Sequence, residues 1–164
     1  MYFFILKIFW LLFIPNSIYV FFPNCLLAQT KYNMVPIPAG KLMVYSKYDG
    51  KEVFIDNFFM DSFEVSQESY EKIINFNPSF FVHRKRPVEK VNWFEAVEYC
   101  LKIGKRLPSE WEWAARSGNT SKFYWGKEDP KLYSWFNKNS ERKTQPIGQK
   151  KPNSYGLFDM AGNV

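Results

Sequence analysis

The sequence contains very little histidine or cysteine, and this excludes several common kinds of catalytic site. Its 164 residues include one histidine, His83, and two cysteines, Cys25 and Cys100. A zinc site built from several histidines and a Ser-His-Asp triad with a choice of partners are therefore excluded. The sequence also lacks a C-x-x-C motif, a Walker loop and a glycine-rich dinucleotide turn. We interpret His83 as an ordinary surface residue.

Internal repeats and disorder-promoting composition are also absent. No period of about 20 to 50 residues recurs, which excludes solenoids and propellers. The chain is 46% apolar and 20% aromatic, far from the polar composition of disordered proteins. At this length, we expect a single folded domain.

The N-terminal segment Met1–Ala28 is apolar and carries one charged residue, Lys7. A membrane-spanning helix needs about 20 uninterrupted apolar residues, whereas Pro15 and Pro23 interrupt this run. We therefore predict a signal peptide at residues 1–28, followed by cleavage, and a secreted or periplasmic protein of the cell envelope. An uncleaved anchor and lipid modification of Cys25 are the alternatives.

The remaining chain has only a mild excess of positive charge. The signal segment removes one lysine, so 21 basic residues remain against 16 acidic ones. The densest basic run, residues 83–86, has no interleaved aromatic side chains, unlike a nucleic-acid surface. We expect a solvated loop there, no nucleic-acid partner and no stable membrane span.

Residues 34–65 are rich in β-branched and aromatic side chains, which predicts a hairpin or meander with a turn at 47–50. Beyond Gly118, turn-forming residues dominate and no helical or strand period is sustained. About 45 residues of loop are unusual in a compact domain, so metal ions, disulfides or a partner segment are expected to hold them.

Three helices are predicted between these regions by their start and stop signals. The first begins after Ser66 and ends at Asn77-Pro78. The second has Asn92 and Glu95 as a capping box and ends at Gly104. The third begins at Ser109, with Glu112 at the capping-box position, and ends at Gly118.

The second predicted helix carries an apolar stripe at i, i+3, i+4, i+7 and i+8. Its members are Trp93, Ala96, Val97, Cys100 and Leu101. We interpret this stripe as the buried face, with Cys100 as a core thiol, and expect Trp93→Ala to cost about 3–5 kcal/mol.

Four charged residues around the third helix are interpreted as structural. Arg106, Glu110, Glu112 and Arg116 are spaced for ion pairs along a helix and its preceding turn. This interpretation assigns them no acid–base chemistry.

Five motifs in a fixed order carry a family resemblance. They are Phe63-Glu64-Val65-Ser66-x-x-x-Tyr70; Pro87-Val88-x-x-Val91-Asn92-Trp93-x-x-Ala96-x-x-Tyr99-Cys100; Gly104-Lys105-Arg106-Leu107-Pro108-Ser109-Glu110-Trp111-Glu112-Trp113-Ala114-Ala115-Arg116; Tyr124-Trp125-Gly126; and Pro146-Ile147-Gly148 with Pro152-Asn153-x-x-Gly156-Leu157-Phe158-Asp159-Met160-x-Gly162-Asn163-Val164. Together they closely resemble the sulfatase-modifying-factor domain, the family of the formylglycine-generating enzyme.

The resemblance implies a domain over residues 34–164 with an α+β fold, a loop-rich variant of the C-type lectin-like fold. In the family, the run that matches residues 156–164 continues into Trp-Glu-Trp and a long C-terminal part. The chain is therefore expected to be an N-terminal portion, truncated at its C-terminus and at best marginally folded.

The resemblance also implies a structural calcium site. It would take the side chain of Asp159 and the carbonyl oxygens of Gly162 and Val164, and a glutamate beyond Val164 completes it in the family. Such oxygen ligands suit calcium. Without that glutamate the site is incomplete, and a turn that holds no ion is the alternative for residues 159–164.

Catalytic relatives use two C-terminal cysteines to bind Cu(I), and with O2 they oxidise a sulfatase cysteine to Cα-formylglycine. The resemblance implies no catalytic residue in this chain, because neither copper ligand is present and Cys100 also lacks the late cysteine with which it pairs in several members. Two functions stay open for the full-length relative. It could be an oxidoreductase that acts on sulfatases, or a non-catalytic binding or structural module of the cell envelope. Iron-dependent sulfoxide synthases are a less favoured branch.

Overall fold

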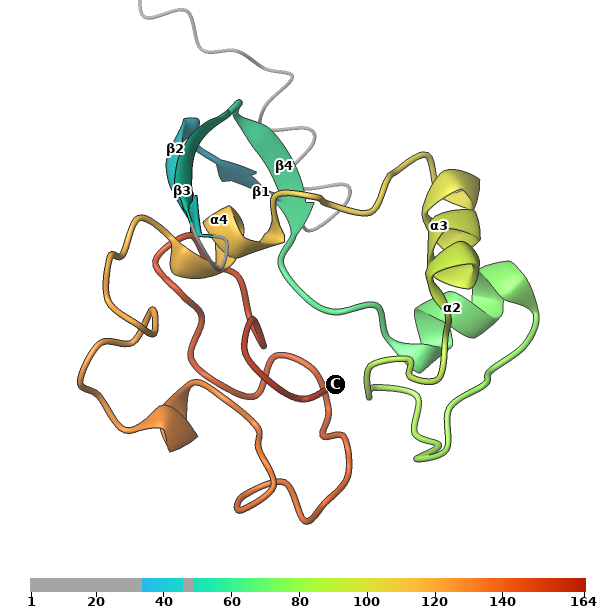
Figure 1. The fold of residues 1–164 in the computed structure, drawn as a ribbon. Coiled ribbons are helices and arrows are strands. Elements are labelled where there is room, and N and C mark those ends of the chain that lie inside the picture. Colours follow the sequence, from blue (N-terminus) through green and yellow to red (C-terminus); the bar gives the residue numbers. More distant parts are fainter. Residues whose placement is uncertain (1–33, 46–48) are drawn as a thin grey trace, which may run out of the picture.

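The computed structural model describes residues 34–45 and 49–164. Figure 1 shows strands and a short helix on one side of the molecule, a pair of helices on the other, and long loops from the C-terminal third below both. Among the helices of these ranges, none has the length and apolar character to cross a bilayer. The predicted signal segment, residues 1–28, lies outside the described residues.

Four short strands form two antiparallel pairs. Strand β1 (Met34–Ile37) pairs with β4 (Phe58–Asp61), and β2 (Gly40–Tyr45) pairs with β3 (Gly50–Ile55). The hairpin predicted for residues 34–65 is therefore confirmed as β2–β3. The Pro-containing start of the region is itself a strand, since β1 is hydrogen-bonded to β4.

Helices α2 (Gln67–Ile74) and α3 (Trp93–Lys102) begin where their caps predicted. The Ser66 side chain accepts a hydrogen bond from the backbone N–H of Ser69. At α3, Asn92 and Glu95 form the complete reciprocal capping box. Both predictions are confirmed, because each start signal is made by residues adjacent in the sequence.

The predicted start of the third helix is wrong in detail. Helix α4 (Trp111–Arg116) has Glu110 as its N-cap residue and no side-chain capping bond. The Glu110 carboxylate is held instead by the Arg106 guanidinium, in two bonds of 2.9 and 2.7 Å. The helix therefore begins at Trp111 without the predicted cap from Ser109.

The core lies between β1, α4 and the chain around residues 155–160. Its buried members are Ile37, Ala114, Ala115, Leu157 and Met160. The connection between β1 and β2 contacts α4 closely, because the Trp113 indole N–H donates to the Pro38 carbonyl at 2.9 Å.

The loops between residues 119 and 164 are held by backbone hydrogen bonds within their turns, by side-chain hydrogen bonds and by stacked rings. Asn153, which is 6% exposed, donates to the carbonyls of Ala114 and Ala115 at 2.8 and 3.2 Å. It also accepts from the backbone N–H groups of Tyr155 and Leu157. No cysteine lies in these loops, so a disulfide, one of the expected restraints, does not hold them.

Stacked aromatic rings add a second restraint on the same loops. Phe123 stacks on Trp125 with ring centroids 4.8 Å apart, and Trp125 stacks on Tyr133 at 6.0 Å. These rings connect the turn at residues 123–125 with Tyr133. The one regular element between them is the 3-10 turn Pro130–Leu132.

A buried glutamine organises the half of the molecule that contains α2. Gln67 is 1% exposed and uses all four hydrogen-bonding positions of its amide. It donates to the carbonyls of Phe81 and Pro87, and it accepts from Asn77 and from the backbone of His83. This one side chain fixes the loop that follows α2.

The predicted buried face of α3 is wrong. Trp93 is 65% exposed and Leu101 is 68% exposed, whereas Tyr99 is 7% exposed and stacks on Tyr70 of α2 with ring centroids 5.2 Å apart. Cys100 is half-buried rather than fully buried. The middle of the predicted stripe, Ala96, Val97 and Cys100, is half-buried, so the prediction fails at its two ends, Trp93 and Leu101. The buried face is rotated toward Tyr99, which α2 covers.

We therefore expect Tyr99→Ala to lower the free energy of unfolding by about 3–5 kcal/mol, because it removes a buried ring from the contact with α2. Trp93→Ala should cost about 0.5 kcal/mol or less, as for other surface changes. Urea unfolding of both variants measures the difference. A larger loss from Trp93→Ala would show that the sequence-based orientation of α3 is right after all.

Candidate functional site

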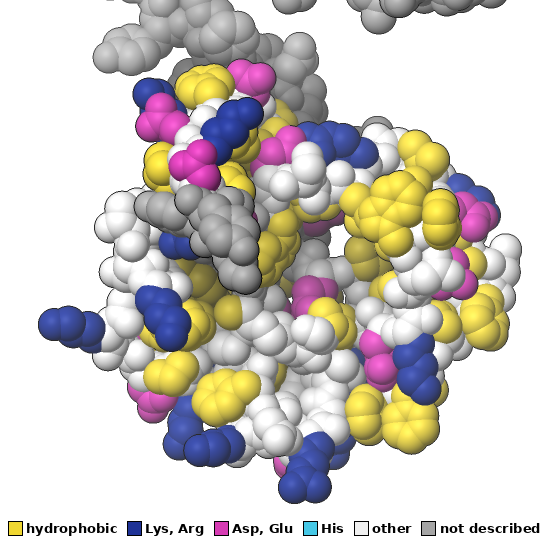
Figure 2. Space-filling view, viewed as in Figure 1, with side chains coloured by type: hydrophobic (Ala, Val, Ile, Leu, Met, Phe, Trp, Pro, Cys, Tyr) yellow, Lys and Arg dark blue, Asp and Glu magenta, His cyan; other side chains and the backbone are white. Residues whose placement is uncertain are grey.

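A cavity of about 940 Å³ opens between the β1–β4 pair, α3 and the C-terminal turn. In Figure 2 a hollow is visible between the strands and the α2–α3 pair. Apolar side chains make up most of its wall, among them Met34, Phe58, Met60, Ile103, Trp111 and Phe158. Such a cavity, with a few polar groups, is the usual form of a binding site.

The polar part of the wall includes Glu64, Cys100 and Asp159, and the turn residues Gly162 and Val164 also line the cavity. These residues come from the connection after β4, from α3 and from the end of the chain. The structure thus brings together, along one cavity, all three residues of the predicted calcium site. Three further charged residues, Asp61, Lys105 and Arg106, belong to the same wall.

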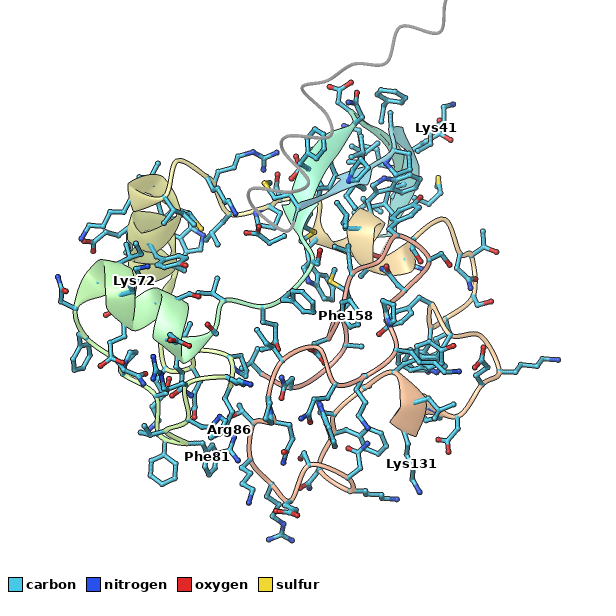
Figure 3. The ribbon with its side chains drawn as sticks, turned by 180° about the vertical axis from the view of Figure 1, so that it is seen from behind. Lys41, Lys72, Phe81, Arg86, Lys131 and Phe158 are labelled. Carbon is cyan, nitrogen blue, oxygen red and sulfur yellow. The ribbon has the colours of Figure 1, made fainter. Side chains whose placement is uncertain are left out.

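Residues 159–164 form a tight turn with three left-handed backbone conformations, at Asp159 (φ 53°), Gly162 (φ 87°) and Asn163 (φ 85°). A Cβ atom at Gly162 would lie 2.1 Å from the carbonyl oxygen of Trp135. Only glycine allows this approach of the two backbones. Figure 3 labels Phe158, which precedes the turn and stacks on Phe63 at 4.8 Å.

Asp159 is 6% exposed, and its two carboxylate oxygens differ. Oδ2 accepts from the backbone N–H of Gly148 at 2.7 Å, whereas Oδ1 is buried and has no hydrogen-bond partner among the described residues. Burial raises the pKa of Asp159, opposed by the Gly148 hydrogen bond and the charge of Lys150. A buried carboxylate oxygen without a partner normally requires an explanation such as a water or an ion.

The donor set of this turn fits a hard cation. Asp159 offers a carboxylate oxygen without a hydrogen-bond partner among the described residues. Gly162 and Val164 line the same cavity, and each carries a backbone carbonyl oxygen. Calcium takes such oxygen ligands. Within residues 34–45 and 49–164, no three His, Cys, Asp or Glu side chains gather as a metal cluster, so backbone oxygens would have to supply much of the coordination.

Glu64 is a site residue to which the sequence analysis gave no role. Its Oε2 accepts from the Asn163 side-chain amide at 2.7 Å across 99 residues. Burial raises the pKa of Glu64 to about 8; the Asn163 hydrogen bond opposes this rise and the nearby charge of Asp159 adds to it. The sequence offers one sign of a role for Glu64, which is an acidic residue between the apolar residues Phe63 and Val65.

Cys100 lies at the wall of the cavity as a free thiol. Burial, and secondly the charge of Asp61, raise the pKa of Cys100, while Lys105 lowers it. Lys105 itself is paired with Asp61 at 2.6 Å. This environment favours the protonated thiol over the nucleophilic thiolate.

The structural interpretation of the charged residues around α4 is confirmed. Arg106 pairs with Glu110, and Arg116 pairs with Glu112 at 2.9 Å. The Arg106 guanidinium lowers the pKa of Glu110 to about 2. His83 is exposed, as expected, and Figure 3 shows Phe81 and Arg86 on the same outlying loop.

The fold and the turn define a loop-rich α+β domain of the formylglycine-generating-enzyme type, which confirms the predicted fold class. Residues 24–164 match the family model described as the sulfatase-modifying factor enzyme 1-like domain. The chain belongs to this FGE-sulfatase family.

Individual relatives agree with this assignment. The chain is 29% identical to the chaperone protein LppX of Paenibacillus barcinonensis, over 73% of this chain and 64% of that protein. It is also 29% identical to the formylglycine-generating enzyme of Mus musculus, over 84% of this chain and 57% of the enzyme. The chain therefore spans about three-fifths of the length of these relatives.

A solved protein structure is also similar to this chain. Treponema denticola variable protein 1 superposes with a TM-score of 0.72 at 28% identity, covering 80% of this chain and 70% of that one. This similarity supports the arrangement of strands, helices and loops described above.

The turn at Gly162 provides a direct test of this site. Gly162→Ala and Gly104→Ala both place a side chain at positive φ, but a Cβ at Gly104 would meet nothing within 4 Å. We expect Gly104→Ala to cost about 1–2 kcal/mol from backbone conformation alone, and Gly162→Ala to cost about 1–3 kcal/mol more from the contact with Trp135. Urea unfolding measures both, and equal losses would contradict the close approach of the two backbones.

Proposed function

We propose that this chain forms a non-catalytic scaffold of a sulfatase-modifying-factor domain, and that these 164 residues alone do not oxidise a sulfatase cysteine to Cα-formylglycine. The observation that carries this proposal is the environment of Cys100. It is the single cysteine of the described residues, and its raised pKa disfavours the thiolate. Binding of Cu(I) by soft ligands requires thiolates, and the mechanism implied by the resemblance requires a pair of them.

The family relationship supports an oxidoreductase role for a longer form. The relative from Mus musculus is a formylglycine-generating enzyme, and the shared portion includes 84% of this chain. A longer protein that added two thiols beside the cavity would have the residues for this reaction, with a sulfatase as its protein substrate. The described residues would then supply the wall of the site and not its reactive groups.

A second candidate function is a binding or structural module of the cell envelope. It is favoured by the large, mainly apolar cavity and by exposed aromatic residues on α3, Trp93 and Phe94. Relatives with other names, a chaperone protein and a variable protein, are consistent with a role other than oxidation. The apolar segment 1–28 supports export of the chain for either role.

We also propose that the turn at residues 159–164 holds a structural calcium ion. The support is the Oδ1 of the buried Asp159, which has no hydrogen-bond partner in the described part of the chain, together with the position of Gly162 and Val164 in the lining of the same cavity. A bound divalent cation would compensate the buried negative charge of Asp159. Its role would be to stabilise the turn.

The oxidation proposal is tested by adding copper and O2 to residues 29–164 with a sulfatase-derived peptide, and measuring the aldehyde by mass spectrometry. We expect no aldehyde above a control that contains copper and peptide only, because a single protonated thiol cannot replace a thiolate pair. A formylglycine-generating enzyme under the same conditions is the positive control. Aldehyde formation above the copper control would contradict the proposal.

A further inference from the structure

A hydrogen bond between Glu64 and Asn163 connects the segment after β4 with the C-terminal turn at the candidate cation site. Glu64 follows β4, and Asn163 lies between Gly162 and Val164. Their side chains meet in the bond of 2.7 Å from Nδ2 to Oε2. In the sequence, Asn163 therefore lies between Gly162 and Val164, the two residues whose backbone oxygens are proposed as ligands.

The Asn163 side chain is fixed from several directions. Its Oδ1 accepts from the backbone N–H of Gln145 at 2.8 Å, and its Nδ2 donates to the Gln145 carbonyl at 3.1 Å. Its backbone N–H donates to the carbonyl of Trp135 at 3.2 Å. With the bond to Glu64, these contacts determine how the peptide groups on either side of Asn163 are oriented.

The choice of a carboxylate at position 64 is not explained by this hydrogen bond alone. A neutral acceptor would satisfy Nδ2 without placing a second buried acid near Asp159. In the described part of the chain, the groups that donate to Glu64 and Asp159 are uncharged, the Asn163 amide and the Gly148 backbone. Lys105 and Arg106 also line the cavity, but each is paired with another acid, Asp61 and Glu110. Lys150 acts on Asp159 through its charge without donating a hydrogen bond to it. Among the described residues, Glu64 and Asp159 thus receive hydrogen bonds from uncharged groups alone, an arrangement that a cation would complement.

We propose that Glu64 is a positioning residue for a hard divalent cation, acting through Asn163 to orient the backbone groups of Gly162 and Val164 and placing a second carboxyl group beside Asp159. The inference rests on the proposed calcium site of the 159–164 turn. It assigns Glu64 to the outer shell of that site, which holds the ligands in place rather than touching the ion.

The test is calorimetric titration of the full chain with calcium chloride, for the unaltered protein and for Glu64→Gln and Glu64→Ala. Removal of an outer-shell partner typically weakens metal affinity about 10- to 100-fold, so we expect a rise of this order in the calcium Kd for both variants. Glu89→Gln is the matched control, because Glu89 is also half-buried and accepts one backbone N–H, that of Phe81. Its Kd should be unchanged.

Thermal melts in chelator and in calcium separate positioning from a purely structural role. Glu64→Gln preserves a hydrogen-bond acceptor for Asn163, so we expect this variant to fold. Its calcium Kd then decides the test even if Glu64→Ala fails to fold. A Glu64→Gln variant that melts differently in chelator but binds calcium with the unaltered Kd would overturn the role of Glu64 alone. Absence of calcium binding by the unaltered protein would overturn the calcium site and this inference together.

Discussion

The buried amide of Asn153 is the interaction on which most of this fold depends. Its four hydrogen bonds join the last carbonyls of α4 to the backbone of residues 155–157. Helix ends leave carbonyl groups that require partners, and a loop inside a protein has the same requirement for its N–H groups. Asn153 satisfies both at once, which allows Leu157 and Met160 to enter the core next to α4.

Two further amides act in the same way in places where no strand ladder exists. Gln67 fixes the loop after α2, and Asn163 fixes the C-terminal turn against Gln145. Specific side-chain hydrogen bonds to backbone groups therefore add to the backbone hydrogen bonds of the turns in ordering these loops. Asp159 Oδ1 is one of five buried side-chain atoms of the described residues that lack a hydrogen-bond partner, and it is the one carboxylate oxygen among them.

Features encoded by neighbouring residues could be predicted from the sequence. The caps at Ser66 and Asn92 and the β2–β3 hairpin are local signals, and the motif order identified the family. The buried face of α3 was not predictable, because the stripe through Trp93 and Leu101 shows which residues share a face but not which neighbour covers it. Tyr99 is buried because α2 happens to present Tyr70 to it.

The amide contacts of the loops have no sequence period, so they were also beyond prediction. Within the site, Asp159, Gly162 and Val164 could be selected because they form one short motif. Glu64 could not, since its partner Asn163 lies 99 residues away. A role that arises only when distant segments meet requires the folded structure.

The measurement that tests the central role of Asn153 most directly is the unfolding free energy of Asn153→Ala in urea. We expect a loss of about 2–4 kcal/mol, because the change leaves buried donors and acceptors without partners. Asn137→Ala, at an exposed position in the same loops, should change stability by about 0.5 kcal/mol or less. Equal stability of the two variants would contradict the account, since the loops and α4 would then be held together by something other than the Asn153 amide.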